Sequence, residues 1–344
     1  MSHKVERMWI VWEQQRRSEE LARRLSCSFH VFDLKGLRRY PVSIAGTVAL
    51  LARHRPRYLF VQNPSMILAG LACLYGMVTR NVVVVDRHTT FLLNKPKTFS
   101  IWRTVFLTLH YLTLRTASLT IVTNSYLAKL VREAGGRPFV LPDPIPVLSP
   151  MSVSHLEGRR NVLFVSSFGD DEPVAEVLEA ARQLQLPDVR IYISGNPRRG
   201  TVDWSAHAPS NVAFTGFIPT GDYVSLLFAV DAVIVLTTAD HCMLCGCYEA
   251  VAAHKPLITS DKEDLREYFR GAEFVEAQAD SIVRGLRRVL ADLSTYQERT
   301  AAMGDEMIRR WADAFSDFEE ELAKAARGSS SAADLGTRSR GQAT

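Results

Sequence analysis

The sequence of 344 residues is 47% hydrophobic and 23% charged, which excludes a largely disordered chain and predicts two domains of about 150 residues each. The net charge of +4 is unevenly spread, because residues 1–150 hold 21 Lys and Arg against 8 Asp and Glu, whereas the remainder holds 20 against 29. The basic first half predicts an anionic partner, either phosphate or lipid head groups, and five scattered cysteines exclude a disulfide framework.

The first half alternates short β-rich runs with helical stretches. The run VVVVD at 82–86 is continuously apolar, as expected for a parallel strand covered on both faces. Repeated strand–helix alternation predicts βαβ units and a doubly wound sheet. The expected strands are 8–12, 29–34, 58–62, 82–86 and 118–123, and the expected helices are 18–25, 43–53, a helix from 65, 98–116 and 125–134.

The proline-rich segment at 140–153 lacks periodicity and predicts an interdomain linker. Strand–helix alternation then restarts and ends in a long terminal helix. We therefore expect an α/β protein with two Rossmann-like doubly wound domains, and a ligand at the carboxyl ends of the strands. The expected boundaries are a first domain at 1–145, a linker at 146–158, a second domain at 159–305, a terminal helix at 306–327 and a disordered tail at 328–344.

Two apolar stretches were compared with membrane spans. Met66–Val78 is uncharged but has only 13 residues, short of the roughly 20 that span a bilayer. The stretch 101–122 is longer but contains Arg103, His110 and Arg115. Neither predicts a spanning helix, and the first apolar run is interrupted by Glu13, unlike a signal peptide. We expect a cytoplasmic protein.

The first domain also combines apolar and basic residues near 94–115. The basic loop NKPK at 94–97 lies close in sequence to Trp102, Phe106 and Tyr111. This combination predicts peripheral contact with the inner face of an anionic membrane.

Residues 231–261 carry the clearest site. The buried strand AVIVLT runs into a loop that ends at a helix start near Leu244, Cys245 and Gly246. Backbone N–H groups and the helix dipole at such a start favour phosphate. Glu249 lies about one turn into the helix, where its carboxylate can accept hydrogen bonds from two vicinal hydroxyls, as on a ribose.

The run from Gly216 to Asp261 resembles the donor half of GT-B glycosyltransferases, in the retaining family 4-like group. The shared pattern is a strand ending at Gly216, the run VDAVIVLTT, and then Glu249, Ala250, Ala252, Lys255 and Pro256 in register. The resemblance implies two Rossmann-like domains facing a central cleft and a C-terminal helix that crosses back. It implies transfer of a sugar, with retention, from a nucleotide-sugar donor to a lipid-linked or polysaccharide acceptor, with no separate cofactor.

The resemblance also assigns roles. Glu249 binds the donor ribose, and the backbone from Met243 to Gly246 meets the diphosphate. The acidic position eight residues before Glu249 is occupied by His241, with Asp240 beside it, and both are candidates for contact with the transferred sugar. His88, after the strand 82–86, takes the place of a cleft histidine near the reacting sugar.

The basic residues that usually hold the diphosphate are replaced in this chain. SSFGDDEP, with Asp170, Asp171 and Glu172, stands where the group carries Arg and Lys, and these acids predict repulsion of a diphosphate. The candidate replacements are Arg198 and Arg199 in the loop GNPRRG, or Arg16 and Arg17 in EQQRRS, which replaces the group's glycine-rich first loop.

Four alternatives were weighed. The absence of the usual Arg and Lys at the diphosphate position favours a catalytically weak or inactive GT-B-like ligand-binding protein. Zinc is disfavoured, because no second ligand pair follows at structural-zinc spacing, and no metal is expected. The ligands considered for it are His241, Cys242, Cys245, Cys247 and His254. A dehydrogenase is disfavoured by the absence of G-x-G-x-x-G after a predicted strand, and no nucleic-acid motif is present.

Overall fold

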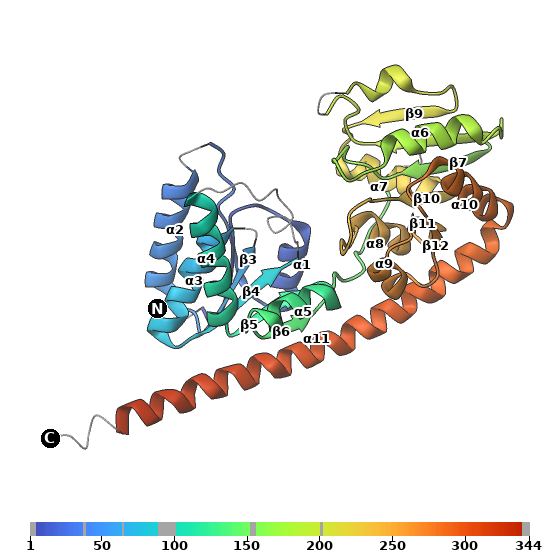
Figure 1. Cartoon of the computed structure of the whole chain (residues 1–344). Coiled ribbons are helices and arrows are strands. Elements are labelled where there is room, and N and C mark those ends of the chain that lie inside the picture. The colour runs from blue at the N-terminus through green and yellow to red at the C-terminus, as the bar shows by residue number, and fades with distance from the viewer. Residues whose placement is uncertain are drawn as a thin grey trace. The chain divides into compact units, whose positions relative to one another are not determined.

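The computed structural model describes residues 5–36, 39–63, 65–88, 101–151, 156–199 and 202–338 (Figure 1). The chain divides into two compact units. Unit 1 comprises Met1–Asp143 and Ala312–Thr344, and unit 2 comprises Pro144–Trp311. Each unit contains one parallel six-stranded sheet, which confirms the predicted α/β class.

Unit 1 has the strand order β2-β1-β3-β4-β5-β6. The order reverses between β1 and β3, since β2 lies on one side of β1 and all later strands lie on the other. The strands are β1 (Arg7–Val11), β2 (Ser28–Val31), β3 (Tyr58–Asn63), β4 (Val82–Arg87), β5 (Leu119–Val122) and β6 (Pro138–Val140). The helices are α1 (Arg16–Arg24), α2 (Arg39–His54), α3 (Met66–Thr79), α4 (Ile101–Thr116) and α5 (Ser125–Glu133).

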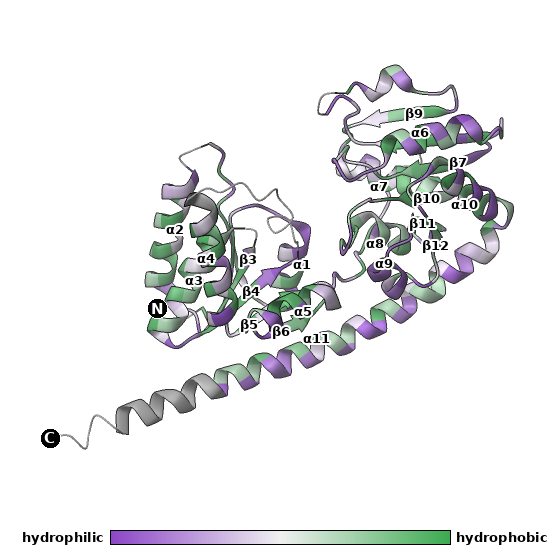
Figure 2. Ribbon diagram, viewed as in Figure 1, coloured by the Kyte–Doolittle hydropathy of each residue, from purple (hydrophilic) through white to green (hydrophobic). Residues whose placement is uncertain are grey.

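The two faces of this sheet differ in what covers them. Val83 and Val85 of β4 share a buried cluster with Leu51 of α2 and Leu68 of α3, so this face carries α2 and α3, with α4 beside them (Figure 1). In Figure 2, α3 is drawn hydrophobic along its length, as its uncharged sequence requires. Because side chains alternate along a strand, Arg87 points to this face and Asp86 to the opposite one, toward α1.

Unit 2 has the strand order β12-β11-β10-β7-β8-β9, and its order reverses between β7 and β10. The strands are β7 (Arg160–Phe164), β8 (Val189–Ser194), β9 (Val212–Gly216), β10 (Ala232–Val235), β11 (Leu257–Ser260) and β12 (Glu273–Val275). The helices are α6 (Val174–Gln183), α7 (Thr220–Ala229), α8 (Cys245–Ala252), α9 (Glu263–Tyr268) and α10 (Ala279–Ala291), with a short 3₁₀ turn at Trp204–His207.

The long helix α11 (Leu293–Arg338) belongs to unit 2 as far as Trp311 and to unit 1 from Ala312. In unit 1 its Phe318 is fully buried, with its ring centroid 5.2 Å from that of Phe139 in β6. The sequence predicts a terminal helix that ends at 327, but no proline interrupts the chain after that point and α11 continues to Arg338. The rest of the expected tail, 339–344, lies outside the described residues.

A buried ion cluster organises the carboxyl edge of the sheet in unit 1. The Arg17 Nε and Nη2 atoms donate to the Asp86 carboxylate at 3.0–3.1 Å, and Nη1 donates to Asp143. Nη2 also donates to the Leu141 carbonyl at 2.8 Å. The cluster thus joins α1 to β4 and to the segment that follows β6. Burial alone would lower the pKa of Arg17, but the two carboxylates outweigh that effect and raise it.

We expect Arg17→Met to lower the free energy of unfolding by about 3–5 kcal/mol, because it leaves two carboxylates without their cation. Urea titration followed by circular dichroism measures the change. Arg23→Met is the matched control: this exposed arginine of the same helix pairs with Glu20 at the surface, so its loss should change the free energy of unfolding much less. Equal effects of the two variants would contradict the structural role of Arg17.

Asp86 makes stability depend on pH in the acid range. Burial would raise the pKa of Asp86, but the Arg17 charge and the neighbouring His88 lower it to about 2. Since this value lies below the unfolded one of about 3.9, the stabilisation is complete above about pH 4 and is lost as the pH falls toward 2. We expect Asp86→Asn to flatten the fall in unfolding free energy between pH 4 and 2. An unchanged slope would show that the pKa of Asp86 in the folded protein is not lowered.

Candidate functional site

The carboxyl edge of the unit 2 sheet contains the point where the strand order reverses, between β7 and β10. Open parallel sheets bind ligands at such points, because the loops after the two strands leave in opposite directions. Hydrogen bonds join the loop after β7 to the loop after β10. The Asp171 carbonyl accepts from Thr238 N at 2.7 Å, and the Asp171 carboxylate accepts from Thr237 Oγ1.

Helix α8 begins directly above this point. Gly246 in its first turn is buried, and a Cβ there would lie 3.0 Å from Val235 Cγ1 and 3.1 Å from Val165 Cγ1. The glycine therefore lets the helix start pack closely on the ends of β10 and β7. Leu244, the N-cap, makes no side-chain hydrogen bond to the first turn. Backbone N–H groups at such an end, from Met243 to Gly246, suit an oxyanion.

Glu249 lies further along α8, and a tyrosine orients it. The half-buried Glu249 carboxylate accepts a hydrogen bond at 2.6 Å from the Tyr223 hydroxyl of α7. Tyr223 was not predicted from the sequence, because it lies on the preceding helix and belongs to no recognisable motif. The contact fixes the direction of the carboxylate at the edge of the site.

Asp240 and His241 are each held by a partner outside their loop. His241 Nδ1 lies 2.7 Å from Asp264 Oδ2 of α9, and its backbone is left-handed with φ of 58°. Asp240 Oδ1 accepts from Lys262 Nζ at 2.6 Å, which lowers the pKa of Asp240, and Lys262 also donates to the Thr238 carbonyl. Lys262 was not predicted from the sequence, although its position just after β11 places it on the same edge of the sheet.

The acidic loop after β7 is largely satisfied by its own groups. The Glu172 carboxylate accepts from Ser166 Oγ at 2.6 Å, from Ser167 N at 2.9 Å and from Gly169 N at 3.2 Å. Asp171 is engaged by Thr237 and Thr238, as described above, whereas Asp170 is exposed. Two of the three carboxylates are therefore held in place by hydrogen bonds, and the expected repulsion of a diphosphate stays a prediction.

The two arginines of the loop after β8 are positioned differently. Arg199 Nη1 donates to the Ser167 carbonyl at 2.8 Å, which brings its guanidinium to the loop after β7. Arg198 is 76% exposed and pairs with Asp203 at 3.4 Å. Gly216 ends β9, two strands from β7, and has a positive φ of 69°. Of the two arginines, Arg199 is the one on the carboxyl edge beside β7.

The candidates of unit 1 lie at the edge of its own sheet. All three guanidinium nitrogens of Arg17 donate to groups of unit 1, so it serves structure, and Arg16 is exposed at the start of α1. His88 follows β4, is 12% exposed and has Nδ1 3.3 Å from Asp86 Oδ2, outside hydrogen-bond geometry. The expected basic loop at 94–97 lies outside the described residues.

The cysteines near the site behave as packing residues. Cys247 is fully buried, with Sγ 3.4 Å from Thr259 Oγ1, and burial raises the pKa of its thiol to about 12. Burial also raises the pKa of Cys242, where Asp171 and Asp264 add to the effect. Within the described part of the chain, no three His, Cys, Asp or Glu side chains are grouped so that they could hold a metal ion.

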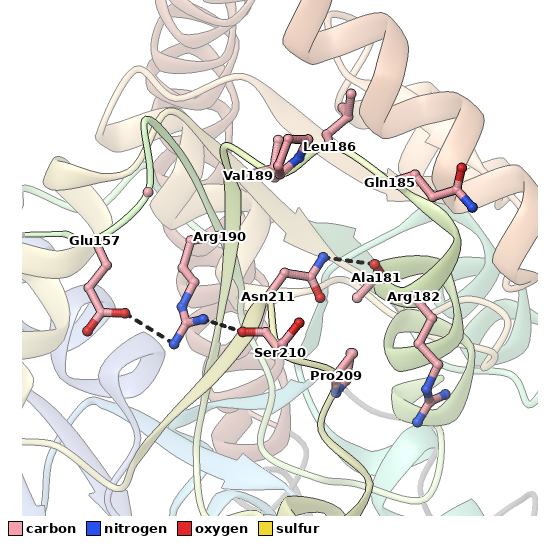
Figure 3. A pocket seen from close by; sticks show the side chains of 12 residues that line it. Glu157, Ala181, Arg182, Gln185, Leu186, Val189, Arg190, Pro209, Ser210 and Asn211 are labelled. Atoms are coloured by element: carbon pink, nitrogen blue, oxygen red, sulfur yellow. Dashed lines mark hydrogen bonds and ion pairs between the residues drawn. The ribbon is translucent and has the colours of Figure 1, made fainter.

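A cavity of about 770 Å³ lies at the opposite end of the same sheet (Figure 3). Its wall includes Val189 and Arg190 at the start of β8 and Asn211 just before β9. Arg190 is engaged by Glu157 and the Ser210 carbonyl, and Asn211 donates to the Ala181 carbonyl. Since the amino ends of parallel strands seldom carry ligands, the carboxyl edge is the better candidate.

Comparisons with known proteins agree with this position. The model of the family "Glycosyl transferases group 1" matches residues 151–306, which include the whole site of unit 2. No curated protein sequence matches the chain.

Three solved structures share the fold. HepE of Anabaena in complex with UDP has a TM-score of 0.69 at 14% identity, covering 93% of this chain and 100% of its own. Sucrose-phosphate synthase from Thermosynechococcus elongatus has a TM-score of 0.65 at 13% identity, covering 92% and 99%. A glycosyltransferase from Rickettsia africae has a TM-score of 0.65 at 11% identity, covering 92% and 89%. Residues 151–306 therefore match the glycosyl transferases group 1 family, and the chain as a whole shares the GT-B fold of these structures.

Proposed function

We propose that the protein transfers a sugar, with retention, from a nucleotide-sugar donor bound in unit 2 to a lipid-linked or polysaccharide acceptor. The observation that carries the proposal is the pair Glu249–Tyr223 beside the uncapped start of α8, at the point where the strand order reverses. It is supported by the fold shared with HepE, which has been solved with UDP and with UDP-glucose.

Each part of the donor has a matching group. Glu249 accepts hydrogen bonds from the ribose hydroxyls, and the N–H groups from Met243 to Gly246 meet the diphosphate. Arg199 and Lys262 supply the positive charge that the loop after β7 lacks. Arg17 is left out of this site, since its guanidinium is committed within unit 1.

The transferred sugar is assigned to Asp240 and His241. The contact between His241 Nδ1 and Asp264 holds the imidazole ring in place at this end of the loop. In the reaction, the bond from the sugar C1 to the diphosphate oxygen breaks as the bond to the acceptor oxygen forms on the same face. The acceptor proton passes to the leaving diphosphate, so no protein nucleophile is required.

The departures from the family pattern favour one alternative, a GT-B-like protein that binds a nucleotide without turnover. Its motivating observation is that Asp171 and Glu172 stand where basic residues are usual after β7. Binding of a nucleoside diphosphate without transfer or hydrolysis of any sugar nucleotide in a panel of UDP-, GDP- and ADP-sugars would favour that alternative.

Calorimetric titration with UDP, GDP and ADP tests the donor site. We expect one of the three to bind, and Glu249→Ala to weaken that binding by about 1–3 kcal/mol, because ribose hydroxyls lose their acceptor. Tyr223→Phe is expected to have a smaller effect, since it releases the carboxylate without removing it. Glu179→Ala, an exposed acid of α6, is the control and keeps wild-type affinity. No binding of any of the three would refute the proposal.

We also propose that the face of α3 and α4 in unit 1 touches an anionic membrane. No helix in the described ranges is both long and apolar enough to cross a bilayer. Leu74, Met77 and Val78 fall on one stripe of α3 and are 54%, 52% and 76% exposed. Val105 and Leu112 of the neighbouring α4 are also exposed. Such an apolar face on a basic unit suits a lipid surface.

Sedimentation with vesicles that contain phosphatidylglycerol measures this contact. We expect the double variant Met77→Glu, Val78→Glu to lower the bound fraction at least several-fold, because it removes apolar area and adds charge of the membrane's own sign. The control is Val147→Glu, which changes a residue of unit 2 that is 91% exposed. Equal binding of both variants and the wild type would exclude this face.

A further inference from the structure

Arg87, the last residue of β4, is a buried cation that lacks an acidic partner among the described residues. It is 6% exposed. Its Nη1 lies 2.6 Å from His110 Nδ1, and its Nη2 lies 3.5 Å from Thr113 Oγ1, both on α4. Its Nε has no hydrogen-bond partner. The edge formed by Nε and Nη2, which normally grips a carboxylate or phosphate, is therefore without an anion.

Arg17 provides the comparison within the same sheet. It is 8% exposed, close to Arg87, yet its Nε–Nη2 edge grips Asp86 and its Nη1 meets Asp143. The pKa of Arg17 is raised as a result. By contrast, burial lowers the pKa of Arg87 to about 10, and burial together with the Arg87 charge lowers the pKa of His110 to about 4. His110 is thus a neutral acceptor and does not compensate the charge.

The sequence around Arg87 contains no acid that could fill this role. From Arg87 to Arg132 there is no Asp or Glu, a stretch that runs through α4, β5 and most of α5. Asp86 is adjacent in the chain but points to the other face of the sheet, where Arg17 holds it. An isolated buried charge is costly and is normally paired, so its retention points to an anion supplied from outside the chain.

A cavity of about 550 Å³ lies at the carboxyl edge of the same sheet, and its wall includes neither Arg87 nor His110. It lies beside β1 and β3, where the strand order of unit 1 reverses, and its wall includes Trp12 and Tyr40 as well as Phe106 of α4. The Phe106 ring centroid is 6.4 Å from that of His110, one turn along the helix. A single aromatic side chain therefore links the wall of the cavity to the His110–Arg87 pair.

We propose that Arg87 binds an oxyanion carried by the acceptor, with the rest of the acceptor in this cavity. The shared chemistry is a phosphate or carboxylate group that takes two hydrogen bonds from the Nε–Nη2 edge. The aromatic wall suits a sugar ring or another flat apolar group next to that anion. The word acceptor rests on the proposed function, whereas the anion site itself does not.

Titration of the full chain with inorganic phosphate, followed by thermal unfolding at constant ionic strength in chloride, tests the site. We expect phosphate to raise the Tm of the wild type in a saturable way. Arg87→Met should weaken phosphate binding on the order of tenfold or more, and Arg87→Lys less, since lysine keeps the charge but not the paired donors. Arg53→Met, an exposed arginine of α2, is the control and should respond like the wild type.

The Tm in chloride alone separates a binding role from a structural one. If Arg87 serves to bind an anion, the Tm of Arg87→Met should equal or exceed that of the wild type, because the substitution removes an uncompensated buried charge. A lower Tm combined with an unchanged phosphate response would overturn the proposal. So would a phosphate response that all variants share, since that response would come from another site.

Two organic phosphates identify the source of the anion. Glucose 6-phosphate represents a phosphorylated sugar, and dihexanoyl phosphatidic acid represents a lipid phosphate. If Arg87→Met weakens the binding of either compound, the site is supported. If both compounds bind the variant as well as the wild type, the proposal is overturned. UDP affinity, measured in the same variant, should be unchanged, so failure of the donor site in unit 2 and failure of the anion site are distinguishable.

Discussion

The pairing of Arg17 with Asp86 determines how charge is distributed along the carboxyl edge of the first sheet. Asp86 and Arg87 are neighbours in β4 and therefore point to opposite faces. Because Arg17 donates to Asp86 on one face, that carboxylate is withheld from the guanidinium on the other. One buried pair thus fixes α1 on the sheet and leaves a second arginine without a counterion.

The second sheet uses its acids in a related way. Asp171 and Glu172 look unsuited to a diphosphate site in the sequence, but their carboxylates accept hydrogen bonds from Thr237, Ser166 and neighbouring backbone groups. The loop is built from negative charge that faces inward, while Arg199 and Lys262 bring positive charge to the same edge. The effect of this loop on a diphosphate therefore depends on where its carboxylates point as well as on how many there are.

The sequence predicted what is local and periodic. Apolar runs such as 82–86 and 232–237 identified buried parallel strands. The helix start before Glu249 was expected where the loop after the run 232–237 ends. β6 was missed because it has three residues, begins with proline and lies at a sheet edge. The partners of Arg17 and Glu249 were missed for another reason: Asp86, Asp143 and Tyr223 are distant in sequence, and only the fold brings them within hydrogen-bond distance.

The same distinction explains what the basic first half of the chain means. An exposed arginine such as Arg53 stays hydrated, so its charge implies no particular partner. Burial removes that hydration, and a buried arginine must recover the loss from a carboxylate, as Arg17 does, or from a bound anion. Composition gives Arg17, Arg53 and Arg87 equal weight, whereas burial and pairing separate them. The excess of positive charge is therefore informative at Arg87, which is 6% exposed and has no carboxylate partner among the described residues.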